Sequence, residues 1–75
     1  MVINRIIEIL SDYLEVDTSE LDGNTQLYLE YDLSDEDIQS FIEMLETEFD
    51  VTIDFDEFTE LSTIEEIAEY IESFI

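Results

Sequence analysis

The sequence contains no cysteine, no histidine, no proline and a single glycine, Gly23, among its 75 residues. Without cysteine the chain can form neither a disulfide framework nor a thiolate metal site. Without histidine it lacks the usual proton shuttle at neutral pH, the partner of Ser and Cys nucleophiles, and the commonest zinc ligand. Arg5 is the sole basic residue, so no positive cluster can hold a phosphate or an oxyanion. We therefore predict that the chain is not an enzyme.

Negative charge dominates instead, with 23 acidic residues and a formal net charge of -22. Such a field repels nucleic acid and anionic membrane surfaces, and it speeds encounters with basic patches on proteins. We expect protein partners with basic docking faces and no nucleic acid. The composition leaves a second interpretation open, in which the charge only keeps a small protein in solution.

The length bounds the architecture, because 75 residues form one domain, residues 1–75, with room for one compact core. Hydrophobic residues make up 45% of the chain, which is too many for the composition of a disordered protein. No apolar run reaches the ~20 residues that cross a bilayer, and the first ten residues lack the features of a secretory signal. We expect a cytoplasmic monomer without membrane insertion.

Apolar residues recur at helical spacing in the first half of the chain. The first such stripe predicts a helix over residues 2–15 and consists of Ile3, Ile6, Ile7, Leu10 and Leu14. A long loop follows from Asp17, where Gly23 is free to adopt a positive φ. Four apolar residues are candidates to pin this loop to the core, namely Leu21 and Leu27, with Leu29 or Tyr31.

A second helix should begin at Ser34, which lies three residues before Asp37 in a pattern close to a capping box. Asp35, Glu36 and Asp37 also place negative charge where a helix N-terminus favours it. One face of this helix is apolar and consists of Ile38, Phe41, Ile42, Leu45 and Phe49. The opposite face is a polar, negative ridge made of Asp37, Gln39, Ser40, Glu43, Glu46 and Thr47. From this ridge we take Asp37, Glu43 and Glu46 as candidates for docking a basic partner.

The last third of the chain predicts an extended connector at residues 51–53 and a short helix around Phe58, capped by Asp54. Ser62 with Glu65 forms the pattern of a capping box for a final helix. Its apolar stripe consists of Ile64, Ile67, Ala68, Ile71 and Phe74. The chain is therefore predicted to be all-α, a small four-helix bundle with three longer helices and a short third one.

The residues resemble the acyl carrier protein family over nearly the whole chain. The similarity is clearest in Leu45–Ile53, and it extends to Phe58–Ile64 with Ile67, Tyr70 and Ile71, and upstream to Arg5, Ile6, Leu14, Val16, Leu21, Asn24 and Leu27. This resemblance implies a carrier that presents an acyl, aminoacyl or polyketide thioester on 4′-phosphopantetheine. It also implies biosynthetic partner enzymes, such as a phosphopantetheinyl transferase, a synthase or a ligase.

In that family, a serine in an Asp-Ser-Leu context at the start of helix two carries the prosthetic group. Aligned without gaps, Asp35 occupies the attachment position and Ser34 lies one residue early. Shifting Ser34 into register would rotate the following residues by about 100° and turn their apolar side chains away from the core. Two hypotheses for Ser34 follow: it is a helix N-cap alone, or it is a displaced attachment serine.

The other serines and a possible calcium loop are weaker candidates for a functional site. Ser11, Ser40 and Ser73 fall within or near helices, where a hydroxyl is ordinarily a solvated surface group, and Ser19 and Ser62 are typical of turns and caps. A calcium loop over residues 32–43 would use Asp32, Ser34, Glu36, Ser40 and Glu43, but Asp37 stands where such a loop requires glycine. We predict no metal site. Two functions remain: a carrier modified at Ser34, or an unmodified carrier-like protein that acts as an acidic interaction or regulatory module.

Overall fold

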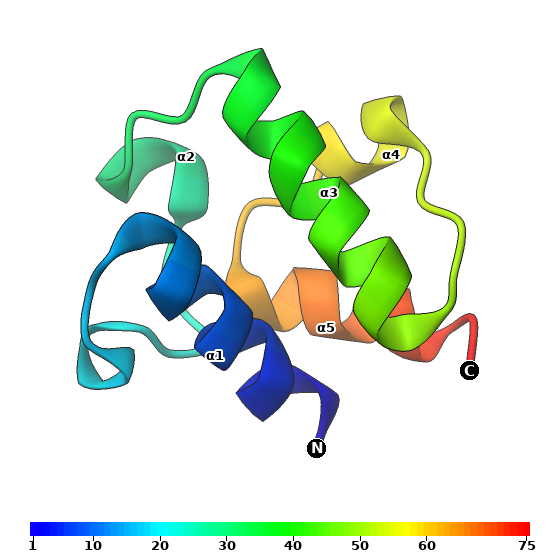
Figure 1. The fold of residues 1–75 in the computed structure, drawn as a ribbon, viewed down its shortest axis with the longest axis horizontal. Helices are drawn as coiled ribbons and strands as arrows, with labels where there is room; N and C mark the ends of the chain where they lie inside the picture. The colour runs from blue at the N-terminus through cyan, green and yellow to red at the C-terminus, as the bar shows by residue number, and fades with distance from the viewer.

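The computed structural model describes residues 1–75 and contains helices alone as regular structure. The three long helices are α1 (Val2–Leu14), α3 (Asp35–Phe49) and α5 (Ile64–Glu72). A short helix, α4 (Phe55–Thr59), precedes α5, as predicted. Figure 1 shows α1 and α3 in front of α5, with α4 beside α3. The predicted all-α bundle is confirmed, with two additions inside the long loop: a 3₁₀ turn at Thr18–Glu20 and the four-residue helix α2 (Leu27–Glu30).

One hydrophobic core joins all the helices and consists of Ile6, Leu10, Leu21, Leu27, Ile38, Phe41, Ile42, Leu45, Ile53, Phe58, Ile64, Ile67, Ala68 and Ile71. Phe41 of α3 and Phe58 of α4 pack edge to face, with ring centroids 5.8 Å apart. One prediction about the core was wrong, since Phe74 is half exposed because it lies beyond the end of α5 and packs on Tyr70. Of the two alternatives offered for the end of the long loop, Tyr31 packs against the core and Leu29 is 82% exposed.

The long loop is attached to the start of α5 by backbone hydrogen bonds. The Glu65 N–H donates to the Gly23 carbonyl at 2.9 Å, and the Ile64 N–H donates to Thr25 at 3.2 Å. Gly23 does not adopt the positive φ that its sequence context suggested. Left-handed conformations occur instead at Glu15 and Asp50, where the C-termini of α1 and α3 turn into the next segment.

The final helix begins one residue later than predicted. Its capping box is formed by Thr63 and Glu66 rather than by Ser62 and Glu65. The reason lies in the tertiary structure, since Thr63 pairs with Gln26 of the long loop and the Ser62 carbonyl accepts the Leu27 N–H at 3.3 Å. Thr63 is thereby held in an extended conformation, so the helix starts after it.

Asp54 and Ser11 each make a local hydrogen bond to the backbone. Asp54 caps α4 as predicted, with its carboxylate accepting the Glu57 N–H at 3.1 Å. Ser11 is buried rather than solvated, and its hydroxyl donates to the Glu8 carbonyl one turn earlier at 2.8 Å. No helix combines the length and the hydropathy needed to traverse a lipid bilayer.

Candidate functional site

The site lies at the N-terminus of α3, where Ser34 is the N-cap in an extended conformation. Its Oγ accepts the Asp37 N–H at 3.2 Å, and the Asp37 carboxylate accepts the Ser34 N–H at 3.1 Å. This reciprocal pair is a complete capping box, and it satisfies two backbone donors that a helix leaves free. The predicted start of the helix at Ser34 is confirmed.

Asp37 also connects this site to α1. The Tyr13 hydroxyl donates to Asp37 Oδ1 at 2.9 Å, joining residues 24 positions apart in the chain. The backbone hydrogen bond from Ser34, followed by the one from Tyr13, lowers the pKa of Asp37. The pKa of Tyr13 is raised, mainly because its proton is held by the Asp37 carboxylate. Nothing in the sequence pointed to Tyr13 as part of the site.

Ser34 and Asp35 differ in whether their side chains can form the link to phosphopantetheine. Asp35 is the first residue of α3 and is exposed, but a carboxylate cannot form the phosphodiester that links phosphopantetheine to a protein. Ser34 is exposed, and its Oγ acts as an acceptor within the chain while donating to no other group. A phosphoester on Ser34 would leave the oxygen on Cβ, next to the Asp37 N–H that it caps. Of these two residues, only Ser34 offers a hydroxyl oxygen that a phosphate group could esterify.

The three predicted docking carboxylates differ in their surroundings. Glu43 is exposed, and its carboxylate makes neither a hydrogen bond nor an ion pair within the chain. Glu46 is half buried, and its carboxylate accepts the Ile53 N–H at 2.8 Å, which braces the connector between α3 and α4. Asp37 belongs to the capping box described above. Of the three, Glu43 is the carboxylate with no structural role of its own.

The sequence matches the phosphopantetheine attachment site family over residues 4–71, which is most of the chain. The chain belongs to the acyl carrier protein family. It is also 32% identical to an acyl carrier protein of Lactobacillus acidophilus over 72 residues, covering 96% of this chain and 90% of that protein. Acyl carrier proteins are carriers rather than catalysts and serve biosynthetic enzymes, so this chain is not an enzyme. The family carries 4′-phosphopantetheine in general.

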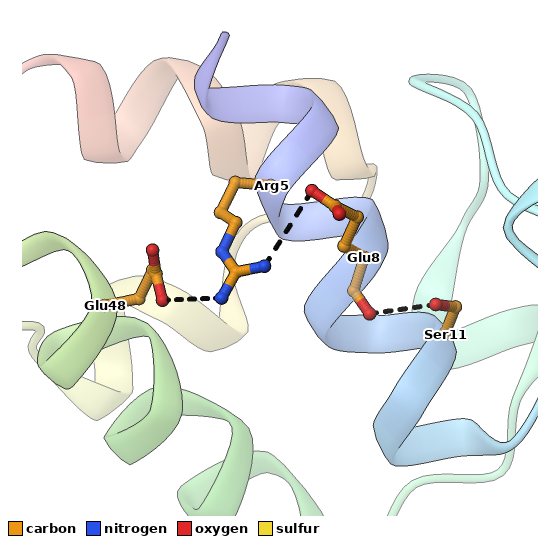
Figure 2. A network of polar contacts seen from close by, with 4 residues as sticks. All are labelled: Arg5, Glu8, Ser11 and Glu48. Carbon is orange, nitrogen blue, oxygen red and sulfur yellow. Dashed lines mark hydrogen bonds and ion pairs between the residues drawn. The ribbon is translucent and has the colours of Figure 1, made fainter.

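Arg5, the one basic residue of this carrier domain, bridges α1 and α3 (Figure 2). Its guanidinium lies 2.9 Å from a carboxylate oxygen of Glu48 on α3 and 3.8 Å from one of Glu8 on α1. The hydrogen bond from Arg5 lowers the pKa of Glu48, and the same bond raises the pKa of Arg5. Local spacing could not reveal this pair, because its members are 43 residues apart.

Two open hollows flank α3. One, of about 540 Å³, lies between α1 and α3 and is lined by Ile9, Asp12, Ser40, Glu43, Met44, Thr47 and Glu48. The other, of about 630 Å³, lies next to Ser34 and is lined by Tyr13, Leu14, Glu30, Tyr31, Asp32, Leu33 and Asp37. Carboxylates contribute to the lining of both hollows.

Proposed function

We propose that this carrier domain presents an acyl or aminoacyl thioester at the start of α3, with Ser34 as the attachment residue. The observation that carries the proposal is the exposed Ser34 hydroxyl, which stands at the N-terminus of α3 and donates to no other group. When attached, 4′-phosphopantetheine supplies the thiol that holds the cargo. Basic-faced biosynthetic enzymes, such as a phosphopantetheinyl transferase, a synthase or a ligase, would then meet the acidic outer face of α3.

The chain's own residues orient the attachment point and attract the partner. The capping box holds the Ser34 backbone, and Tyr13 holds the Asp37 carboxylate that completes the box. The field of a molecule with a net charge of -22 steers basic surfaces toward it. The Glu43 carboxylate, which has no partner within the chain, contributes to association without giving up a structural contact.

A second candidate function has a specific observation in its favour. The Ser34 oxygen already serves as a helix cap. In addition, the family resemblance, aligned without gaps, implies that Asp35 rather than a serine takes the attachment position. An unmodified chain with the same acidic face would bind basic partners as an interaction or regulatory module. The two candidates share a fold and differ in whether the prosthetic group is attached.

Intact mass spectrometry distinguishes them after incubation of the wild-type protein with coenzyme A and a broad-specificity phosphopantetheinyl transferase. The proposed carrier gains the mass of one phosphopantetheine group, and Ser34→Ala abolishes the gain. Ser34→Ala also removes a helix cap and should cost about 1 kcal/mol of stability, so circular dichroism must confirm that the variant is folded. Ser40→Ala, at an exposed position within α3, is the matched control and should keep full modification.

The double variant Asp35→Ser with Glu36→Leu restores the serine of the family motif in its usual register. It serves as a positive control, because modification at residue 35 shows that the transferase accepts this fold. If the double variant is modified while the wild-type protein is not, the carrier proposal is wrong and the unmodified module stands.

A further inference from the structure

A hollow of about 630 Å³ lies beside the proposed attachment point, where the C-terminal end of α1 meets the N-terminal end of α3. Residues 31–33, which connect α2 to α3 (Figure 1), form another side of it. Of the lining residues, Leu33 directly precedes Ser34, and Asp37 forms the capping box with it. The volume falls in the range of about 300–1,000 Å³ that is usual for small-molecule sites. A chain attached to Ser34 would therefore start beside a hollow large enough for a small ligand.

Four of the side chains that line the hollow are aliphatic or aromatic. They are Tyr13 and Leu14 of α1, with Tyr31 and Leu33 of the connecting segment. All but Tyr13 pack against the hydrophobic core, and Tyr13 is held by its hydrogen bond to Asp37. Because these side chains are already in place, an apolar group can be buried against them without a change of fold. Tyr31 also offers a polar contact, since its hydroxyl, unlike those of the other tyrosines, makes no hydrogen bond within the chain.

The charged lining determines which ligand suits the hollow. Its polar residues are Glu30, Asp32 and Asp37, and none of the lining residues is basic. The Glu30 carboxylate already accepts the Gln26 N–H, and Asp37 belongs to the capping box. Asp32 is exposed, and its carboxylate is the acceptor that remains free. The hollow therefore repels an anion and favours a neutral ligand that has N–H or O–H donors beside an apolar group.

The arm of 4′-phosphopantetheine has this chemistry beyond its phosphate. It is uncharged and carries a dimethyl group and a hydroxyl, followed by two secondary amides and the thiol. We infer that the hollow binds this arm, with the dimethyl group against Leu33 and the tyrosine rings and the donors toward Asp32. The inference deepens the proposed function and rests on it, because attachment at Ser34 supplies the tether.

The tether makes a weak site sufficient. A short flexible linker gives an attached group an effective concentration of about 1 mM, so a dissociation constant of that size keeps the arm in the hollow about half of the time. The arm then rests on the carrier between encounters, and a partner enzyme with a tighter pocket withdraws it.

Free pantetheine tests the hollow without any modification of Ser34. The four tyrosines provide the measurement, since Tyr13 and Tyr31 line the hollow while Tyr28 and Tyr70 lie outside it. Unmodified protein with isotope-labelled tyrosine rings is titrated with pantetheine, and the signals are assigned with single Tyr→Phe variants. We expect the Tyr13 and Tyr31 signals to shift and to saturate at millimolar concentrations, while the other two stay in place.

A pair of ligands and three variants test the contacts. Pantothenol should bind roughly 2- to 5-fold more tightly than pantothenate, which has a carboxylate in place of its terminal alcohol, and Asp32→Asn should reduce this difference. Leu33→Ala should weaken pantetheine binding by roughly 4-fold, equivalent to about one buried CH₂ group. Leu29→Ala removes the same atoms from a residue that is 82% exposed outside the hollow and should leave binding unchanged. Circular dichroism checks that each variant is folded, and the surface variant Asp32→Asn decides the matter if Leu33→Ala is not.

Equal shifts of all four tyrosines, or pantothenate bound as tightly as pantothenol, would overturn the inference. The result is separate from the mass measurement on Ser34. If pantetheine selectively moves Tyr13 and Tyr31 but the transferase leaves the wild-type protein unmodified, the binding site is upheld and the attachment proposal fails. If Ser34 is loaded but free pantetheine moves neither signal, the attachment stands and the inference about the hollow is wrong.

Discussion

Asp37 takes part in three hydrogen bonds at the start of α3, two with Ser34 and one with Tyr13. Together they make the ionised carboxylate part of the folded structure and lower its pKa, with the Ser34 backbone bond as the largest cause. A carboxylate whose pKa is lower in the folded state stabilises the fold fully above its unfolded pKa. That stability is lost as the pH falls through the folded pKa.

Asp37→Asn should therefore lower the melting temperature at neutral pH. The difference from wild type should shrink as the pH falls below about 4, the ordinary pKa of aspartate, because the wild-type carboxylate then becomes protonated as well. Thermal unfolding followed by circular dichroism from neutral to acid pH measures this. Asp32→Asn is the control, since Asp32 is exposed and makes no hydrogen bond. A difference that stays constant with pH would show that the charge of Asp37 is not what stabilises the helix.

At the scale of one element, α3 serves the core and the surface at once. Its buried residues are Ile38, Phe41, Ile42 and Leu45, while its outer face carries the acidic ridge. Two of the three candidate docking residues on this ridge also support the fold, since Asp37 caps α3 and Glu46 braces the following connector. Reversing the charge of all three would disturb folding as well as binding. Glu43 is the informative position.

Glu43→Lys should slow association with the phosphopantetheinyl transferase, and the effect should diminish as salt screens it. Stopped-flow measurements over a range of salt concentrations give the association rate. Glu60→Lys changes the net charge of the protein by the same amount, at an exposed residue outside α3, and is the matched control. If both variants slow association equally, the partner responds to the overall field rather than to the face of α3.

At the scale of the whole molecule, 23 acidic residues and one basic residue share a body of 27 × 26 × 19 Å. The Debye length is about 30 Å at 0.01 M salt and about 8 Å at 0.15 M. At low salt it exceeds the longest dimension of the protein, so carboxylates on opposite sides still repel one another. At physiological salt only neighbouring carboxylates do.

The melting temperature should consequently rise with sodium chloride, most steeply at low ionic strength. Differential scanning calorimetry across this range measures the change. Magnesium chloride at equal ionic strength separates screening from cation binding, because screening alone gives the same curve for both salts. A melting temperature that does not respond to either salt would rule out carboxylate repulsion as an important factor in stability.

The sequence by itself determined the features that depend on neighbours within about one helical turn. The spacing of apolar residues determined which face of α1, α3 and α5 is buried, because helical periodicity sets those faces without reference to the rest of the chain. Ser34 and Asp54 marked the starts of α3 and α4, because each caps a backbone N–H three residues away. The missing histidine and basic residues also pointed correctly away from an enzyme.

Contacts between distant residues were decided by the tertiary structure alone. Periodicity shows that a side chain faces the core but not which helix it meets. No local pattern in the sequence therefore indicated the Tyr13–Asp37 and Arg5–Glu48 contacts, or the hollow between α1 and α3. The later start of α5 has the same origin, since the long loop pairs with Thr63 and keeps it extended. Glu46 likewise looked like a free surface carboxylate until the fold brought the Ile53 N–H beside it.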